Sequence, residues 1–62
     1  MTIGQNIKRL RIQIDLTQAE LGKLTKIPEF LIRYYELNLI KPRHRHLKAI
    51  ARALHVDFRI LL

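Results

Sequence analysis

The fold is decided by residues 18–37, which read QAELGKLTKIPEFLIRYYEL. Thr17 precedes this stretch as an N-cap, and Thr17 and Glu20 have the spacing of a capping box, in which each side chain accepts from the backbone amide of the other residue. Pro28 interrupts the helical pattern and suits the first turn of a new helix. The stretch therefore predicts two short helices joined by a tight turn, the second running from about Pro28 to Leu37.

Small and apolar residues within this stretch indicate how the two helices pack. Gly22 falls in the middle of the first helix, where Gly costs about 1 kcal/mol relative to Ala, so the close approach of another helix is its expected reason. The side chains expected to face inward are Leu21, Leu24, Ile27, Ile32 and Tyr35. A steeply crossing pair of this kind is a helix-turn-helix motif. We expect Gly22→Val to overpack the crossing and Gly22→Ala to be tolerated or stabilising.

Helical spacing continues on both sides of the motif. Residues 2–5, TIGQ, form another capping box, and a stripe at steps of four, three and four follows it: Ile3, Ile7, Leu10 and Ile14. Pro42 can start a fourth helix, whose inward positions are Leu47, Ile50, Ala51 and Leu54. Asp57 can cap a last helical turn over residues 58–62. The pattern predicts an all-α, compact bundle of five short helices forming one domain, residues 1–62.

Composition excludes several classes of protein. A chain of 62 residues has room for one small domain, and the absence of Cys excludes disulfides and thiolate metal sites. No Ser-His-Asp arrangement, paired carboxylates or Gly-rich phosphate loop is present, so we expect neither an enzyme nor a cofactor. His44 and His46 are two residues apart and face different sides of a helix, so no metal site is expected. Apolar runs are too short to span a bilayer, and we expect a cytoplasmic protein.

Charge gives the first indication of a partner. The chain has 12 Lys and Arg against 5 Asp and Glu, a net charge of +7. This excess favours a polyanionic partner, nucleic acid first and an anionic membrane second, although small domains also carry charge for solubility. Several caps and breakers argue against one long amphipathic helix lying on a membrane. Arg45, Lys48 and Arg52 share one helix face, which is either a solvated surface or a DNA contact.

Three segments carry a resemblance to a known family. They are residues 3–11, IGQNIKRLR, residues 16–21, LTQAEL, and the pair Tyr35-Glu36, followed by the spacing of Pro42, Leu47, Ile50-Ala51, Ala53-Leu54 and Val56. In this order they resemble the phage repressor and Cro (XRE-type) DNA-binding domains over nearly the whole chain. Residues 32–36 and 39–42 also resemble a helix of MerR-type regulators, but only locally, because the β wing of that family is missing.

The resemblance implies five helices and a symmetric dimer with the third helix in the major groove of double-stranded DNA. It implies base-edge contacts by Glu29, Phe30 and Tyr34. The phosphate contacts implied by the two comparisons are those of Thr17, Gln18, Arg33, Asn38, Lys41 and Arg43. It also implies a partly buried ion pair between Arg11 and Glu36.

The chain departs from the family pattern at the motif itself. Lys26 occupies the turn position usually held by Gly, and Pro28 replaces the usual Ser or Thr cap of the third helix. The outward face of that helix carries Glu29 and Phe30 in place of the polar residues typical of base readers. Glu can accept from cytosine N4 and Phe can pack on a thymine methyl group. Exposed apolar groups also suit a protein-binding surface.

The C-terminal residues 56–62 are more apolar than one short helix can bury on a single face. We therefore expect a two-fold contact made by Phe58, Ile60, Leu61 and Leu62, while Phe58 and Leu61 have the alternative of closing the core of a single chain. The leading hypothesis is a sequence-specific DNA-binding transcriptional regulator, a repressor that binds an operator as a homodimer and is encoded by a bacterium or phage and associated with the nucleoid. The alternative is an antitoxin or anti-regulator, which would bind protein through the third or the C-terminal helix.

Overall fold

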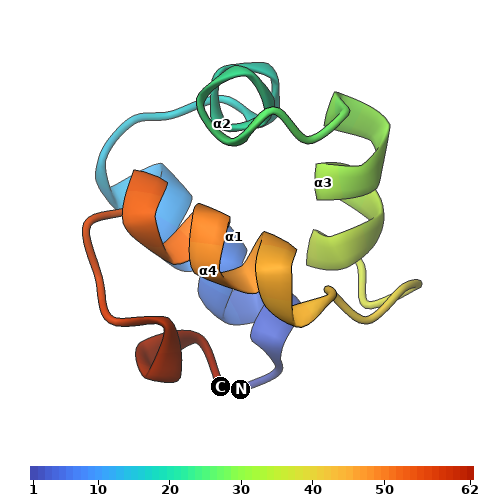
Figure 1. The fold of residues 1–62 in the computed structure, drawn as a ribbon, viewed down its shortest axis with the longest axis vertical. Helices are drawn as coiled ribbons and strands as arrows, with labels where there is room; N and C mark the ends of the chain where they lie inside the picture. The colour runs from blue at the N-terminus through green and yellow to red at the C-terminus, as the bar shows by residue number, and fades with distance from the viewer.

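Four α-helices and one short 3₁₀ helix make up the computed structural model, which describes residues 1–62 and contains no strand (Figure 1). Their bounds are α1 (Ile3–Gln13), α2 (Gln18–Thr25), α3 (Glu29–Glu36), α4 (His44–Ala53) and the 3₁₀ helix η1 (Phe58–Leu61). The all-α fold is confirmed. The count of five α-helices is wrong, because the last segment is too short for an α-helical ladder and closes with i to i+3 bonds, such as Ile60 N–H to Asp57 O at 2.9 Å.

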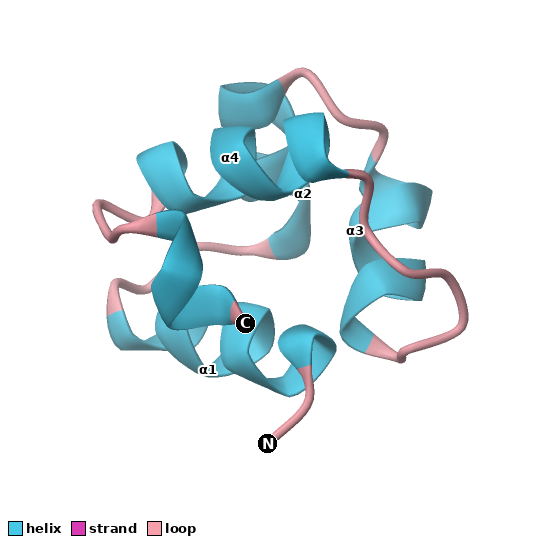
Figure 2. Ribbon diagram, turned by 60° about the horizontal axis from the view of Figure 1, so that its bottom comes forward, coloured by secondary structure: helices cyan, strands magenta, loops and turns pink.

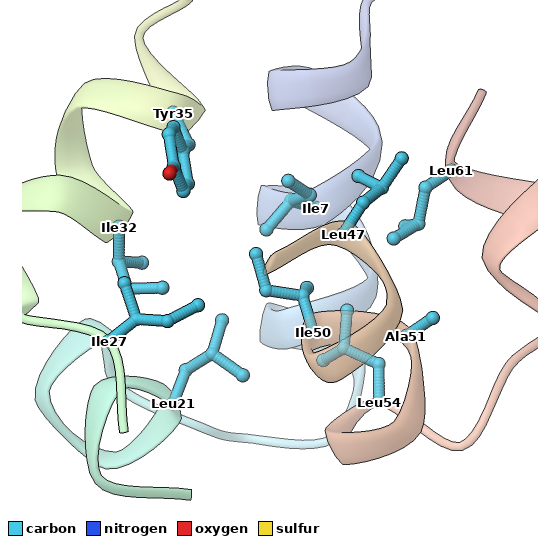
Figure 3. Packing of buried hydrophobic residues seen from close by; sticks show 10 residues of the cluster. All are labelled: Ile7, Leu21, Ile27, Ile32, Tyr35, Leu47, Ile50, Ala51, Leu54 and Leu61. Carbon is cyan, nitrogen blue, oxygen red and sulfur yellow. The ribbon is translucent and has the colours of Figure 1, made fainter. Parts of the chain in front are cut away.

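The helices surround one core (Figures 1 and 2). α2 packs against α3 and α4, α3 also packs against α1, and η1 packs against α1 and α4. Ten apolar residues from every helix, the α2–α3 turn and the C-cap of α4 form the core (Figure 3): Ile7, Leu21, Ile27, Ile32, Tyr35, Leu47, Ile50, Ala51, Leu54 and Leu61. Because α3 contributes Ile32 and Tyr35 to this core, its opposite side is left free to face outward.

Local signals set the helix ends. Both predicted capping boxes are present, one made by Thr2 with Gln5 and one by Thr17 with Glu20. A residue in the left-handed conformation follows or ends each α-helix, and none of these is Gly: Asp15, Lys26, Asn38 and His55. Such a residue reverses the chain directly after a helix. The α1–α2 and α2–α3 connections are therefore short, whereas seven residues, 37–43, join α3 to α4.

Two proline positions differ from the prediction. Pro28 is the N-cap of α3 rather than a residue of its first turn. Pro42 lies before the N-cap of α4, which is Arg43, so Pro42 is not a helix start. Neither proline has an N–H to donate, and both suit the extended residues that lead into a helix.

Two apolar residues expected to face inward are exposed. The inward side of α2 is set by Leu21, Gly22 and Thr25, and Leu24 lies about 100° from Thr25 around the helix axis, so 62% of its surface is exposed. Ile14 is the C-cap of α1, and its backbone has already left the helix. The apolar face of α1 therefore includes Ile7 but ends before Ile14, whose side chain is exposed.

A hydrogen bond that the sequence did not predict ties α3 to α4. The Tyr35 hydroxyl lies 2.7 Å from Nδ1 of His46, and it can donate to the ring nitrogen of a neutral imidazole. Burial lowers the pKa of His46 below its usual 6.5, and the nearby charges of Arg45 and Arg43 lower it further. The folded chain therefore binds a proton at His46 less readily than the unfolded chain does.

This predicts a loss of stability in mild acid. Because the unfolded chain binds a proton at His46 more readily than the folded chain, the free energy of unfolding should fall as the pH drops below 6.5. Urea titrations between pH 7.5 and 5 measure this dependence. The variant His46→Gln should show a weaker pH dependence, whereas the control His44→Gln should keep it. A pH dependence that survives His46→Gln in full would contradict the assignment.

Candidate nucleic-acid interface

The turn between α2 and α3 is closed by the carbonyl of Gly22. It accepts the backbone N–H groups of Lys26 and Ile27, the latter at 3.0 Å. Lys26 has φ 59°, so the turn has the left-handed conformation for which Gly is usual, made here by a Lys. Gly22 is buried, and the turn brings the start of α3 against it. The predicted close approach is confirmed.

The expected tolerance of Gly22→Ala is wrong. A Cβ at Gly22 would lie 2.7 Å from the carbonyl oxygen of Ile27, which is backbone and cannot rotate away. We therefore expect Gly22→Ala to destabilise the protein by about 1–3 kcal/mol, reduced by the gain of up to about 1 kcal/mol in helix propensity. Urea unfolding measures the change, with Lys23→Ala on the exposed side of the same helix as the control. An Ala variant as stable as the wild type would show that the turn is looser than described.

A buried network of charged and polar groups fixes α3 against α1 and α2. Arg11 donates to both carboxylate oxygens of Glu36, with Nε to Oε2 at 2.6 Å, and to the Leu16 carbonyl at 2.7 Å. Gln18 adds a bond from Nε2 to Glu36 Oε1 at 3.0 Å. The side chain of Glu36 is only 2% exposed. The predicted Arg11–Glu36 ion pair is thus present, and the sequence did not show that Gln18 joins it.

Gln18 and Thr17 stand at the N-terminal end of α2. Gln18 is half-buried and uses its amide nitrogen on Glu36, while its backbone N–H is one of the first amides of the helix, which have no partner within it. The Thr17 hydroxyl accepts from the N–H of Glu20 at 3.0 Å. Exposed amides at a helix N-terminus suit an anion such as a phosphate. The side chain of Gln18 therefore helps to position α3, while the backbone N–H of Gln18 is the group suited to binding a phosphate.

The outward face of α3 carries the residues expected to read bases. Glu29, Phe30, Arg33 and Tyr34 are all exposed. The rings of Phe30 and Tyr34 meet edge to face with their centroids 5.9 Å apart, so the two aromatic side chains form one surface. This face presents an acid, an aromatic pair and a cation together, and it offers no side-chain amide.

The loop from α3 to α4 lies next to this face and carries the remaining predicted phosphate contacts. Lys41 and Arg43 are exposed, and Arg43 is the N-cap residue of α4. Asn38 has φ 62°, and its side-chain oxygen accepts from the N–H of Gly4 at 3.3 Å. Asn38 thus anchors the loop to α1, a role that its position in the sequence did not reveal.

Gly4 explains how this anchor forms. A Cβ there would collide with the Tyr35 carbonyl oxygen and lie 2.8 Å from that of Glu36, so α1 approaches the end of α3 as backbone against backbone. The sequence contained a signal for this contact, a Gly in the first turn of a helix, but nothing in it identified the partner.

Comparison with known proteins settles the family. The profile of the family described as helix-turn-helix matches residues 7–61, which is most of the chain. The chain belongs to the XRE-type helix-turn-helix family of phage repressors. Among solved structures, this helix-turn-helix protein is similar to the P22 c2 repressor in complex with synthetic operator 9T in the presence of Tl⁺. The two share 27% identity with a TM-score of 0.94, over 100% of this chain and 94% of the other.

No curated protein matches the sequence of this helix-turn-helix chain. None of its helices combines the length and the apolar character needed to cross a membrane.

The residues of this helix-turn-helix domain that were expected at a dimer contact lie in the C-terminal segment, and they differ in how far each side chain is buried. Leu61 is fully buried in the core of the single chain, and the Asn6 side chain donates to its carbonyl at 3.0 Å. The expectation that Leu61 forms a dimer contact is therefore wrong, because closing the monomer core already covers it. Phe58 packs against the core and against the ring of His44. Ile60 and Leu62 remain exposed.

Proposed function

We propose that this protein is a repressor that binds a DNA operator as a homodimer, with α3 of each protomer in the major groove. That it is a DNA-binding transcriptional regulator follows from its family and from its likeness to a repressor–operator complex. The observation that carries the proposal is the match over the whole chain to that repressor, whose complex contains operator DNA. Such a repressor acts on the nucleoid, in the cytoplasm of a bacterial cell.

The exposed side of α3 supports base reading by Glu29, Phe30 and Tyr34. The major groove is wide enough to admit an α-helix, and the buried Ile32 and Tyr35 hold this helix with its other side outward. The Glu29 carboxylate can accept from cytosine N4, and the Phe30 ring can pack on a thymine methyl group. We therefore expect an operator half-site that contains cytosine and thymine where α3 enters the groove.

Cations and helix ends around α3 support contacts with the DNA backbone. Arg33, Lys41 and Arg43 supply charge, and none of them is held in an ion pair within the chain. The neutral members of the proposed set are Thr17, Gln18 and Asn38. Phosphate contacts position the protein on the duplex, and they make its affinity depend on salt.

Substitutions should separate the two kinds of contact. A duplex selected from a random pool supplies the operator, and binding is measured at several salt concentrations. Arg33→Gln, Lys41→Gln or Arg43→Gln should weaken binding to every duplex and lower the salt slope by about one each. Glu29→Gln, Phe30→Leu and Tyr34→Leu should instead change which bases are preferred.

If the Glu29, Phe30 and Tyr34 variants lost the same affinity for selected and unrelated duplexes, these residues would not be base readers. Lys8→Gln on the exposed side of α1 serves as the control for charge, because it removes one cation outside the proposed interface.

A second candidate function is a protein-binding module such as an antitoxin or anti-regulator. It is favoured by the exposed apolar residues on α3 and the loop after it, namely Phe30, Leu37, Leu39 and Ile40. Exposed apolar groups that gather on one surface are typical of protein interaction sites. DNA binding that is weak and insensitive to salt would favour this second function over repression.

A further inference from the structure

The α4 basic row, Arg45, Lys48 and Arg52, is a charged surface that the proposed operator interface does not use. Steps of three and four residues place the three side chains on one face of α4, and all three are exposed. The inward positions of α4, among them Leu47 and Ile50, lie on the opposite face. Arg45, Lys48 and Arg52 line one shallow depression together with His44 and Ala49.

The positive surface continues from α4 to the end of α2. A second depression shares Ala49 and Arg52 with the first and is also lined by Lys26, by His55 and, at its α2 side, by the exposed Leu24. α2 and α4 are in direct contact, so the two depressions form one continuous surface across them.

Nothing in the chain compensates these charges. The two ion pairs are Arg11–Glu36 and Arg59–Asp57, and no acidic residue lies on α4. Lys48 is oriented by an aromatic ring, with Nζ 5.6 Å from the centroid of Phe58, a contact that leaves its charge intact. The α4 basic row is therefore a cluster of uncompensated positive charges at fixed spacing on one helix.

The row and the reading face of α3 point in different directions. In Figure 1, α4 crosses in front of α1, with its outer side toward the viewer, while α3 stands at the right edge of the molecule. The row begins at the α3–α4 loop and runs away from α3 toward the end of α2. A duplex seated on α3 therefore leaves Arg52, at the C-terminal end of the row, free.

We propose that the α4 basic row binds the phosphate backbone of a second DNA duplex, so that a protein on its operator bridges two segments of DNA. The row extends about 10 Å along α4, seven steps of 1.5 Å from Arg45 to Arg52, and a DNA duplex carries one charge per about 1.7 Å of its helix axis. Its central depression contains no large apolar side chain. A protein partner would use an apolar or aromatic core there, and a membrane would need an apolar anchor, so charge complementarity selects a nucleic-acid backbone.

A capture experiment tests the bridge. The selected operator duplex is immobilised and loaded with protein, and a fluorescent duplex of mixed sequence is then added. The wild type should capture the second duplex, with less capture as salt rises. The double variant R45Q/R52Q should stay on the operator, lose capture by roughly tenfold and reduce the salt slope of capture by about two. The matched control K8Q/R9Q removes the same charge from exposed positions of α1 and should retain both activities.

Each of the following results would overturn the proposal that the α4 basic row bridges two duplexes. Undiminished capture by R45Q/R52Q would show that a second α3 holds the other duplex. Equal loss of operator binding and capture would place the row in the operator interface. Binding of the wild type to anionic phosphatidylserine vesicles or to polyglutamate, without capture of duplex, would assign the surface to another partner. Retention on the operator is recorded separately, so failure of the proposed function is distinguished from failure of the bridge, and thermal melting verifies that the variants fold.

Discussion

Replacing Glu36 with Ala should lower the free energy of unfolding by about 3–5 kcal/mol, because it leaves a buried charge without its partner. The substitution leaves the Arg11 guanidinium, whose side chain is 10% exposed, without its carboxylate partner in the interior. It also removes the acceptor of the Gln18 amide. Because whole domains are stable by only about 5–15 kcal/mol, such a loss is a large part of the total.

Urea unfolding at neutral pH measures this loss, and two further variants show whether the buried, unpaired charge causes it. Arg59→Ala breaks the exposed pair with Asp57 and should leave the midpoint nearly unchanged, because exposed pairs contribute little. The double variant R11M/E36L removes both charges and should recover much of the stability, since an apolar pair can replace a buried ion pair. If Glu36→Ala unfolded at the same urea concentration as the wild type, the buried network would have no structural role.

Replacing Ile60 with Glu should weaken operator binding by roughly 10²–10⁴-fold, the gain that linking two binding modules provides. Ile60 is 55% exposed beside the exposed Leu62, and both lie in the segment proposed to join two protomers. A symmetric dimer would place the two α3 helices about 34 Å apart, one turn of B-DNA, so both half-sites are engaged together. A charge at the contact separates the protomers, and each then binds one half-site.

The chain provides a matched control for this variant. Ile12 is 53% exposed on α1, and Ile12→Glu makes the same chemical change outside the proposed contact. It should leave both association and operator affinity close to those of the wild type. Sedimentation at micromolar concentration, with and without the operator, reports association. A wild type that is monomeric in both conditions, or a dimer unaffected by Ile60→Glu, would refute the contact.

The parts of the fold that depend on neighbouring residues could be predicted from the sequence. Both capping boxes and the tight turn before Pro28 each follow from a few adjacent residues. The Arg11–Glu36 pair joins residues far apart in the sequence, and only the family resemblance made it predictable.

The errors arose where the outcome depends on contacts between distant segments. Two apolar residues in a short helix satisfy the same helical pattern, so Leu24 could not be separated from Leu21 until the side facing α4 was known. Helix propensity alone favours Ala over Gly at position 22, because propensity contains no information on the nearby carbonyl oxygen of Ile27. Leu61 and Ile60 are equally apolar, and only the packing of η1 on α1 and α4 shows which one the chain buries.

We infer that α3 and the segments beside it form the surface that recognises DNA. Amide chemical shifts of the labelled protein, followed while one equivalent of selected duplex per dimer is added, test it most directly. The largest changes should fall on Gln18, on α3 and on the loop residues up to Arg43, and they should be smaller with a scrambled duplex of the same composition. Changes confined to α1 and η1, or the same changes with both duplexes, would contradict the claim.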